Sequence, residues 1–143
     1  MTRRALGPAP GLSAEAIDNG LGGQAFADFI GLRRVAPGVT RLTIRPALLN
    51  SVGLLLGPVG FALVDFSMAS ALWEQCGAGE TIATMNVSLN FIESADAGEI
   101  CCRSSLDRRN RHAAALSSQV HHEDGRLLMT AVGSFAIRRV RRA

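Results

Sequence analysis

A single acid, Asp65, stands in the stretch GPVGFALVDFSM, whose other residues are apolar or small. Burying an unpaired carboxylate costs several kcal/mol, so such a residue needs a partner, a wet cleft or a chemical task. Poor solvation would also raise the pKa of the Asp65 carboxyl group and make it a stronger base. Asp65 is therefore either a hydrogen-bonded structural acid or a group that moves a proton or attacks a substrate.

The element that carries Asp65 is predicted to be a buried helix. Pro58 suits the first turn of a helix, and the residues from Val59 to Trp73 are apolar or small on nearly every side, so other structure must wrap this helix. From Val52 to Trp73 the only charge is Asp65. The glycines and the proline in the first half of this stretch nevertheless leave a helix too short to span a membrane.

Alternating polar and apolar residues predict strands around this helix. Residues 38–45 alternate and end before a proline, as a half-buried strand would. Residues 81–92 alternate as well, so Thr84 should share the polar face with Asn86, while Met85 should face the core. One face of this strand is then wet or functional, and the other belongs to the core.

The rest of the chain supplies three more predicted strands. They lie at EICCRSSLD, HAAALSSQVHH and LLMTAVGSFAIRRV, with EDGR as a hairpin turn and Gly133 as a bulge or close-contact position. A strand, a long buried helix and then four strands in hairpin succession indicate an α+β fold. This order matches an antiparallel sheet curled around one central helix, the arrangement called the hotdog fold.

Length and composition indicate a single domain over residues 1–143, with about residues 1–12 as a flexible N-terminal arm and short helical pieces between residues 13 and 31. The formal net charge is only +3, and the chain contains 15 arginines and no lysine. The start of the chain has no apolar core of the length of a signal peptide, so we expect a cytoplasmic protein that is neither secreted nor membrane-bound.

The cysteines and histidines favour no metal site. Cys76, Cys101 and Cys102 form no CxxC pair, and their odd number is typical of reduced thiols. The adjacent Cys101 and Cys102 should point to opposite faces of a strand, as should His121 and His122. No set of cysteine and histidine residues has the spacing of metal ligands, so no metal is expected.

The stretch NSVGLLLGPVGFALVD resembles a loop-to-helix signature, N-x-x-G-x-x-H-G-G followed by an acid, of the phenylacetate-pathway-type (PaaI-like) acyl-CoA thioesterases. The matching positions are Asn50, Gly53, Gly57 and Asp65. Downstream, TMNVSLNFIESADAGE resembles the next strand of that family, and the resemblance covers roughly residues 31–137. It implies a hotdog fold and hydrolysis of an acyl-CoA or similar thioester, with coenzyme A as part of the substrate and no separate cofactor.

The resemblance also implies a role for each site residue. Asp65 would act as general base or nucleophile, and the backbone N–H of Gly57, at the start of the helix, would stabilise the oxyanion. Asn50 and Thr84 would orient the thioester and the attacking water. Because that family builds its sites across a subunit interface, a homodimer or homotetramer is implied.

Two positions depart from the family pattern. Leu56 replaces the histidine, and Pro58 replaces the second glycine. Because proline has no N–H, the oxyanion donor would have to be Gly57 alone or Gly57 together with Val59. These departures leave open an alternative, a hotdog protein that binds acyl-CoA without hydrolysing it. A hotdog dehydratase or hydratase is disfavoured, since no histidine precedes His112.

An arginine-rich turn, RRNRH, follows one of the predicted strands. Arg108, Arg109 and Arg111 could hold the phosphates of coenzyme A, since guanidinium groups recognise phosphate in bidentate fashion. The alternative is a solvated charged turn. The terminal RRVRR lacks interleaved aromatic residues, so we interpret it as a solvated end and expect no nucleic-acid partner.

Overall fold

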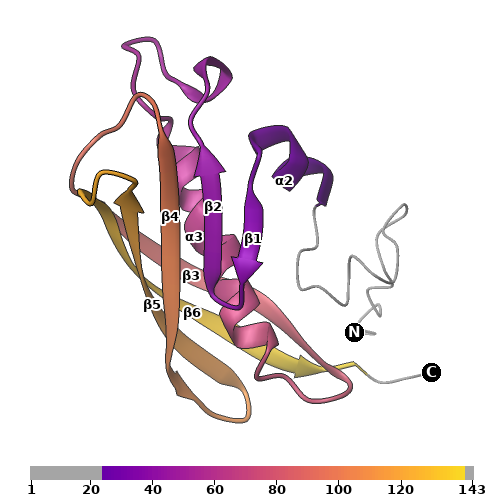
Figure 1. Cartoon of the computed structure of the whole chain (residues 1–143). Coiled ribbons are helices and arrows are strands. Elements are labelled where there is room, and N and C mark those ends of the chain that lie inside the picture. Colours follow the sequence, from indigo (N-terminus) through magenta and orange to yellow (C-terminus); the bar gives the residue numbers. More distant parts are fainter. Residues whose placement is uncertain (1–23, 141–143) are drawn as a thin grey trace.

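The structure is a computed structural model and describes residues 24–140 (Figure 1). Its elements, in chain order, are α2 (Gln24–Ile30), β1 (Arg33–Ala36), β2 (Val39–Thr43), the 3-10 turn Pro46–Leu48, α3 (Gly57–Trp73), β3 (Glu80–Phe91), β4 (Glu99–Arg109), β5 (Ala113–His122) and β6 (Leu127–Arg139). The predicted arm, residues 1–12, and the first predicted helical piece lie outside the described residues. Of the short elements, β1 was not predicted from the sequence.

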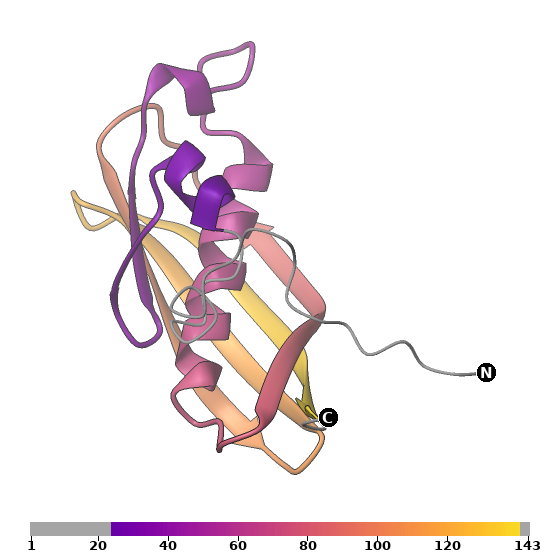
Figure 2. The same cartoon turned by 90° about the vertical axis from the view of Figure 1, so that its right-hand side faces the viewer.

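All six strands form one antiparallel sheet in the order β1-β2-β4-β5-β6-β3. The sheet curls around α3, which lies along its concave face (Figure 2). This confirms the α+β class and the hotdog arrangement. No helix within residues 24–140 has the length and apolar character that crossing a bilayer requires.

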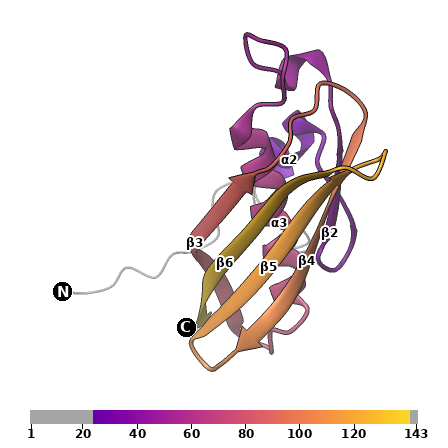
Figure 3. The same ribbon diagram turned by 90° about the vertical axis from the view of Figure 1, so that its left-hand side faces the viewer.

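The predicted hairpin succession of the last four strands is wrong for the first of them. The strands β4, β5 and β6 do follow one another, but β3 pairs with β6 and forms an edge of the sheet (Figure 3). Residues 92–98, which join β3 to β4, are too many for a tight hairpin and carry the chain to the other side of β5 and β6. A connection of this length does not determine which strands pair.

The helix α3 begins where the sequence predicts. Leu56 is the N-cap residue in an extended conformation (φ −60°, ψ 131°), and Pro58 stands in the first turn. Toward the sheet the helix buries Leu63, Met68 and Leu72 completely. Met68 comes so close that a Cβ atom on Gly133 of β6 would lie 2.7 Å from its Sδ atom. Gly133 is therefore a close-contact position, one of the two predicted possibilities.

A β-bulge decides the orientation of Thr84. The register of β3 against β6 shifts between Thr84 and Asn86, and Thr84 lies opposite Phe135, which is buried in the core. Met85, which the alternation placed in the core, is exposed. The prediction that Met85 faces the core is therefore wrong, because the extra residue of a bulge reverses the alternation on one side of it. Thr84 consequently faces α3, and it is exposed, as the polar alternation predicts.

Candidate active site

The carboxyl group of Asp65 lies half-buried in the middle of α3. Thr84 on the edge strand β3 donates a hydrogen bond from its Oγ1 to the Oδ1 of Asp65, at 2.8 Å. Within residues 24–140 the other carboxyl oxygen, Oδ2, accepts no hydrogen bond. Burial raises the pKa of Asp65 above its ordinary value, and the bond from Thr84 offsets this rise only in part. The geometry thus provides a half-desolvated acid with one oxygen free.

The free backbone donor at the start of α3 is Gly57. Its N–H has no acceptor in the described part of the chain, whereas the N–H of Val59 donates to the carbonyl oxygen of Leu56 at 3.0 Å. The expectation that Val59 could supply a second oxyanion donor is therefore wrong, since its proton is already used. Pro58 has no N–H, so the first turn of α3 offers one donor at the position of the motif.

Gly57 and Asp65 lie too far apart on the helix to act on the same atom. Eight residues separate them, which corresponds to about 12 Å along an α-helix at 1.5 Å per residue. A donor and a base that serve one thioester carbon must each come within roughly 3 Å of the reacting atoms. Within one protomer, the structure brings Thr84 to Asp65 but does not bring Gly57 to them.

Asn50 lies in the loop before α3, on the side of Gly57. Its Oδ1 accepts hydrogen bonds from the N–H groups of Val52 and Leu54, each at 3.0 Å, and so shapes this loop. The side-chain oxygen is therefore occupied, whereas the side-chain NH₂ has no partner within residues 24–140. Asn50 is exposed and can act on another molecule only as a donor through this group.

Two exposed phenylalanines flank these groups, and the sequence analysis missed both. A Cβ atom on Gly57 would lie 3.5 Å from Cζ of Phe91, so the Phe91 ring lies next to the free N–H. Phe61 precedes Asp65 by one helical turn, on the same face of α3. Their exposed fractions are 58% for Phe91 and 42% for Phe61. The alternation placed Phe91 in the core, and only the position of Phe61 four residues before the acid could have singled it out.

The three arginines of the β4–β5 turn differ from one another. Arg109 donates to Glu80 at 2.6 Å and also to the carbonyl oxygen of Gln75, so it fastens the end of β4 to the segment between α3 and β3. Arg108 and Arg111 are exposed, and their side chains make no hydrogen bond or ion pair with the described residues. Arg108 and Arg111 are therefore available to an anion, and Arg109 is already engaged.

The acids, cysteines and histidines of residues 24–140 form no group of three that could hold a metal ion. The arrangement consists instead of an acid held by a hydroxyl group, a free amide at a helix start and aromatic surface beside both. The acid can abstract a proton from water or attack a carbonyl carbon, and the free amide can stabilise an oxyanion.

Comparisons with known proteins identify the family and the fold. The Thioesterase superfamily model matches residues 52–129, a segment that includes Gly57, Asp65 and Thr84. A thioesterase from Haemophilus influenzae has a TM-score of 0.80 at 16% identity, over 92% of this chain and 94% of its own. A comparison with curated protein sequences finds no match.

Two further structures are similar. A phenylacetic acid degradation-related protein from Ralstonia eutropha has a TM-score of 0.71 at 26% identity, over 85% of this chain and 97% of its own. A Bacillus halodurans protein solved with CoA has a TM-score of 0.75 at 17% identity, over 87% of each chain. The family model covers more than half of the chain, and these structures share its fold. The chain therefore belongs to the thioesterase superfamily.

Proposed function

We propose that the protein hydrolyses an acyl-CoA thioester to the free acid and coenzyme A, in an active site that two protomers share. The observation that carries this proposal is the half-buried Asp65, whose pKa is raised and whose Oδ1 accepts the hydrogen bond from Thr84. Membership of the thioesterase superfamily supports the reaction class, and the similar protein solved with CoA supports the choice of thioester.

In the proposed reaction, Asp65 takes a proton from a water molecule that Thr84 helps to orient. The hydroxide attacks the thioester carbon, and the negative charge that develops on its oxygen is stabilised by the N–H of Gly57. The tetrahedral intermediate then collapses, the C–S bond breaks, and the proton on Asp65 passes to the leaving thiolate. If Asp65 instead attacks the carbon directly, the C–S bond breaks, the thiolate leaves and an anhydride forms, which water hydrolyses in a second step.

The partner that completes the site is a second copy of this chain. The edge strand β3 carries Thr84 and exposes unpaired backbone groups along 12 residues, with Met85 and Phe91 exposed beside them. A long, apolar edge of this kind is normally covered. Pairing of two such edges about a two-fold axis would bring Asp65 of one protomer toward Gly57 of its partner.

A thiol-release assay over short, long and aromatic acyl-CoA substrates tests the activity. Asp65→Asn should lower the rate by about 10²- to 10⁴-fold, the usual effect of removing a general base. Asp96→Asn is the matched control, because Asp96 is an exposed acid outside α3 and β3. The proposal fails if the parent binds these substrates but hydrolyses none of them faster than Asp65→Asn does.

Mixing two inactive variants tests the shared site. Gly57→Pro removes one N–H, and both the extended Leu56 before it and the helix start tolerate proline at that position. Gly57→Ala keeps the N–H and meets only ordinary contacts, so it is the control. Subunit exchange between Gly57→Pro and Asp65→Asn should restore roughly a quarter of the parent activity, because half of the dimers then contain one intact site of two. No recovery on mixing would exclude a site divided between these two residues.

One observation favours a second candidate, a protein that binds acyl-CoA without hydrolysing it. Leu56 packs against the core where the resembled family has histidine, and the N–H of Val59 is already bonded, so one donor remains. Losing a single oxyanion donor commonly costs about 10²- to 10³-fold in rate. Binding of acyl-CoA by calorimetry with no thiol release would support this candidate. A large gain in activity for Leu56→His would contradict it.

A further inference from the structure

The convex face of the sheet, opposite α3, carries a cluster of reactive side chains that the proposed thioester chemistry does not use. In the register of the sheet, Arg41 of β2 lies opposite Cys101 of β4, and Cys101 lies opposite His121 of β5. Their neighbours Leu42, Ile100 and Val120 are buried beneath α3, so the three side chains point to the convex face together. The predicted opposite orientation of Cys101 and Cys102 is confirmed.

These three side chains are close enough to interact. Directly opposed residues of antiparallel strands have Cβ atoms about 5 Å apart. The pKa of Arg41 is raised, first by its hydrogen bond with Glu99 and next by attraction to the sulfur of Cys101.

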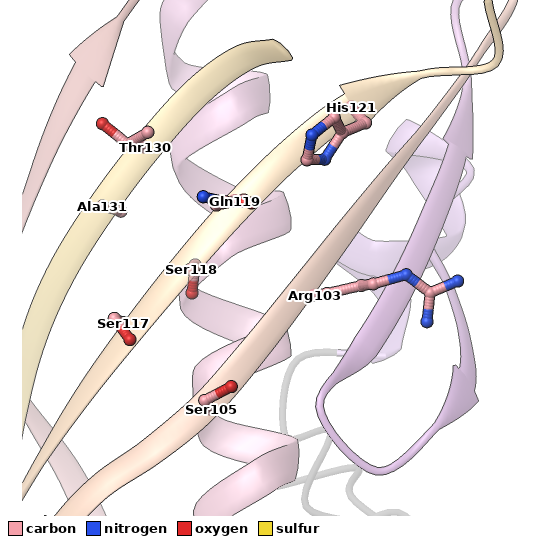
Figure 4. A pocket seen from close by; sticks show the side chains of 8 residues that line it. All are labelled: Arg103, Ser105, Ser117, Ser118, Gln119, His121, Thr130 and Ala131. Carbon is pink, nitrogen blue, oxygen red and sulfur yellow. The ribbon is translucent and has the colours of Figure 1, made fainter. Parts of the chain in front are cut away.

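The cluster opens into two adjoining hollows on the convex face. One hollow, of about 310 Å³, is lined by Cys101 together with Arg41, Arg103 and His121. The other, of about 420 Å³, shares Arg103 and His121 and is otherwise lined mainly by small or uncharged polar residues (Figure 4). The side chains of Arg103 and His121 make no hydrogen bond or ion pair with the described residues.

The charge of these hollows is suited to an anion. The acid nearest to Cys101 in the hollow, Glu99, is held by Arg33 and Arg41, each at 2.7 Å. A second acid at the rim, Glu123, accepts a hydrogen bond from the N–H of Glu99. The three guanidinium groups of Arg33, Arg41 and Arg103 outnumber the carboxylates of Glu99 and Glu123, so one positive charge remains in excess beside the thiol and attracts negative charge.

The other two cysteines lack this setting. Cys102 is buried beneath α3, and Cys76 is partly buried, and burial raises the pKa of both thiols. A raised pKa keeps a thiol protonated and unreactive. Cys101 thus differs from both in its neighbours and in the hollow onto which it opens.

We infer that Cys101 is a site of reversible modification by anionic low-molecular-weight disulfides, which the hollows beside Arg103 and His121 receive. The Cys101 thiol loses its proton to His121 or to solvent, and the thiolate attacks one sulfur of the incoming disulfide. The new bond joins Cys101 to that sulfur, the original S–S bond breaks, and the second half leaves as a thiolate. Electrons balance without any other oxidant, because the incoming disulfide is itself reduced.

The test measures the reaction of the full-length parent protein with two disulfide reagents. The anionic reagent is dithiobis-nitrobenzoate and the neutral one is dithiodipyridine. One thiol per chain should react rapidly, should map to Cys101 by peptide mass spectrometry and should be lost in Cys101→Ser. Glutathione disulfide should add one glutathionyl group at the same residue and release one glutathione, and dithiothreitol should remove the added group. Cys101→Ser should keep the thioester-hydrolysing activity of the parent.

Charge variants separate this proposal from simple exposure of a thiol. Arg103→Gln should slow the reaction with the anionic reagent by about 3- to 10-fold and that with the neutral reagent by less than about twofold, the effect of one nearby charge. Arg138→Gln, an exposed arginine at the other end of the sheet, is the control. The proposal is overturned if the fast thiol maps to another cysteine, if no thiol reacts in the native protein, or if both reagents slow equally.

Discussion

The two sides of α3 treat their polar side chains differently. Toward β2, Ser67 donates to the carbonyl oxygen of Gly38 and accepts from Ser104, while Ser70 donates to the carbonyl oxygen of Ser67 and accepts from the N–H of Gly38. Toward β3, Asp65 accepts a single hydrogen bond within the described chain. The serines on one side of α3 form a closed hydrogen-bond network, whereas the acid on the other side can accept further hydrogen bonds.

This difference separates polar residues that stabilise the fold from one that can act on a substrate. Buried hydroxyl groups that satisfy one another hold the helix against the turn between β1 and β2 and leave nothing for a ligand. An acid that burial has made harder to ionise costs stability and keeps a lone pair for a substrate. The two serines and the acid all lie in one apolar helix, so the sequence of that helix does not show which of these polar residues are structural and which is free to act on a ligand.

The largest expected effect comes from Asp65→Asn, which should change activity and stability in opposite directions. The activity loss of about 10²- to 10⁴-fold corresponds to roughly 3–5 kcal/mol of barrier. The folded-state pKa of Asp65 is raised, so the folded protein binds more protons than the unfolded one between the unfolded and folded pKa values. Its stability therefore falls as the pH rises through that window.

At neutral pH, Asp65→Asn removes the cost of the buried charge. Urea unfolding of parent and variant at neutral pH should therefore show a free energy of unfolding at least as large for the variant. The difference should shrink below the unfolded-state pKa, where both side chains are neutral. A variant less stable than the parent at neutral pH would mean that Asp65 is a structural acid.

A substitution in the closed serine network should instead lower the stability of the fold and leave the titration of the active-site acid unchanged. Ser67→Ala leaves the carbonyl oxygen of Gly38 and the hydroxyl of Ser104 without their partner, which costs about 1–3 kcal/mol. We expect a lower midpoint of urea unfolding and an unchanged midpoint of the pH–rate profile. A shifted pH–rate midpoint would show that the serines tune the acid as well as holding the helix.

A smaller effect is expected from Thr84→Val, which removes the hydrogen bond that lowers the pKa of Asp65. Because Asp65 acts in its ionised form, the acidic limb of the pH–rate profile should move to higher pH, and activity on that limb should fall by about 3- to 10-fold. Thr84→Ser keeps the hydroxyl and should restore the parental profile. Identical profiles for all three proteins would remove Thr84 from the site.

The smallest effects are expected in the arginine turn, which also contains both a structurally engaged side chain and side chains that are free to bind a ligand. Arg109→Gln breaks its pair with Glu80 and should cost about 0.2–1 kcal/mol of stability while leaving KM for an acyl-CoA substrate unchanged. Arg108→Gln and Arg111→Gln should leave stability unchanged and raise KM. Comparison of KM between acyl-CoA and a thioester without the nucleotide measures this directly. A rise in KM with Arg109→Gln alone would reverse the assignment.

Some residues of the candidate site could be predicted from the sequence and others could not. Asp65 stood out because an acid in an apolar helix is costly wherever that helix lies. The free N–H of Gly57 followed from the geometry of any helix start, but the loss of Val59 as a donor did not, since it depends on the orientation of the Leu56 carbonyl group. The engagement of Arg109 depends on Glu80, which lies 29 residues away in the chain.

The sequence was sufficient for those features that neighbouring residues decide. These are the start of α3 at Gly57 and Pro58, the alternation of most strands and the placement of an acid in the helix, because periodicity and turn residues act over a few positions. Only the tertiary structure decided that β3 leaves its predicted neighbour for the edge beside β6, and that a bulge turns Thr84 toward Asp65. Both depend on pairing and packing between distant segments, on which local periodicity has no influence.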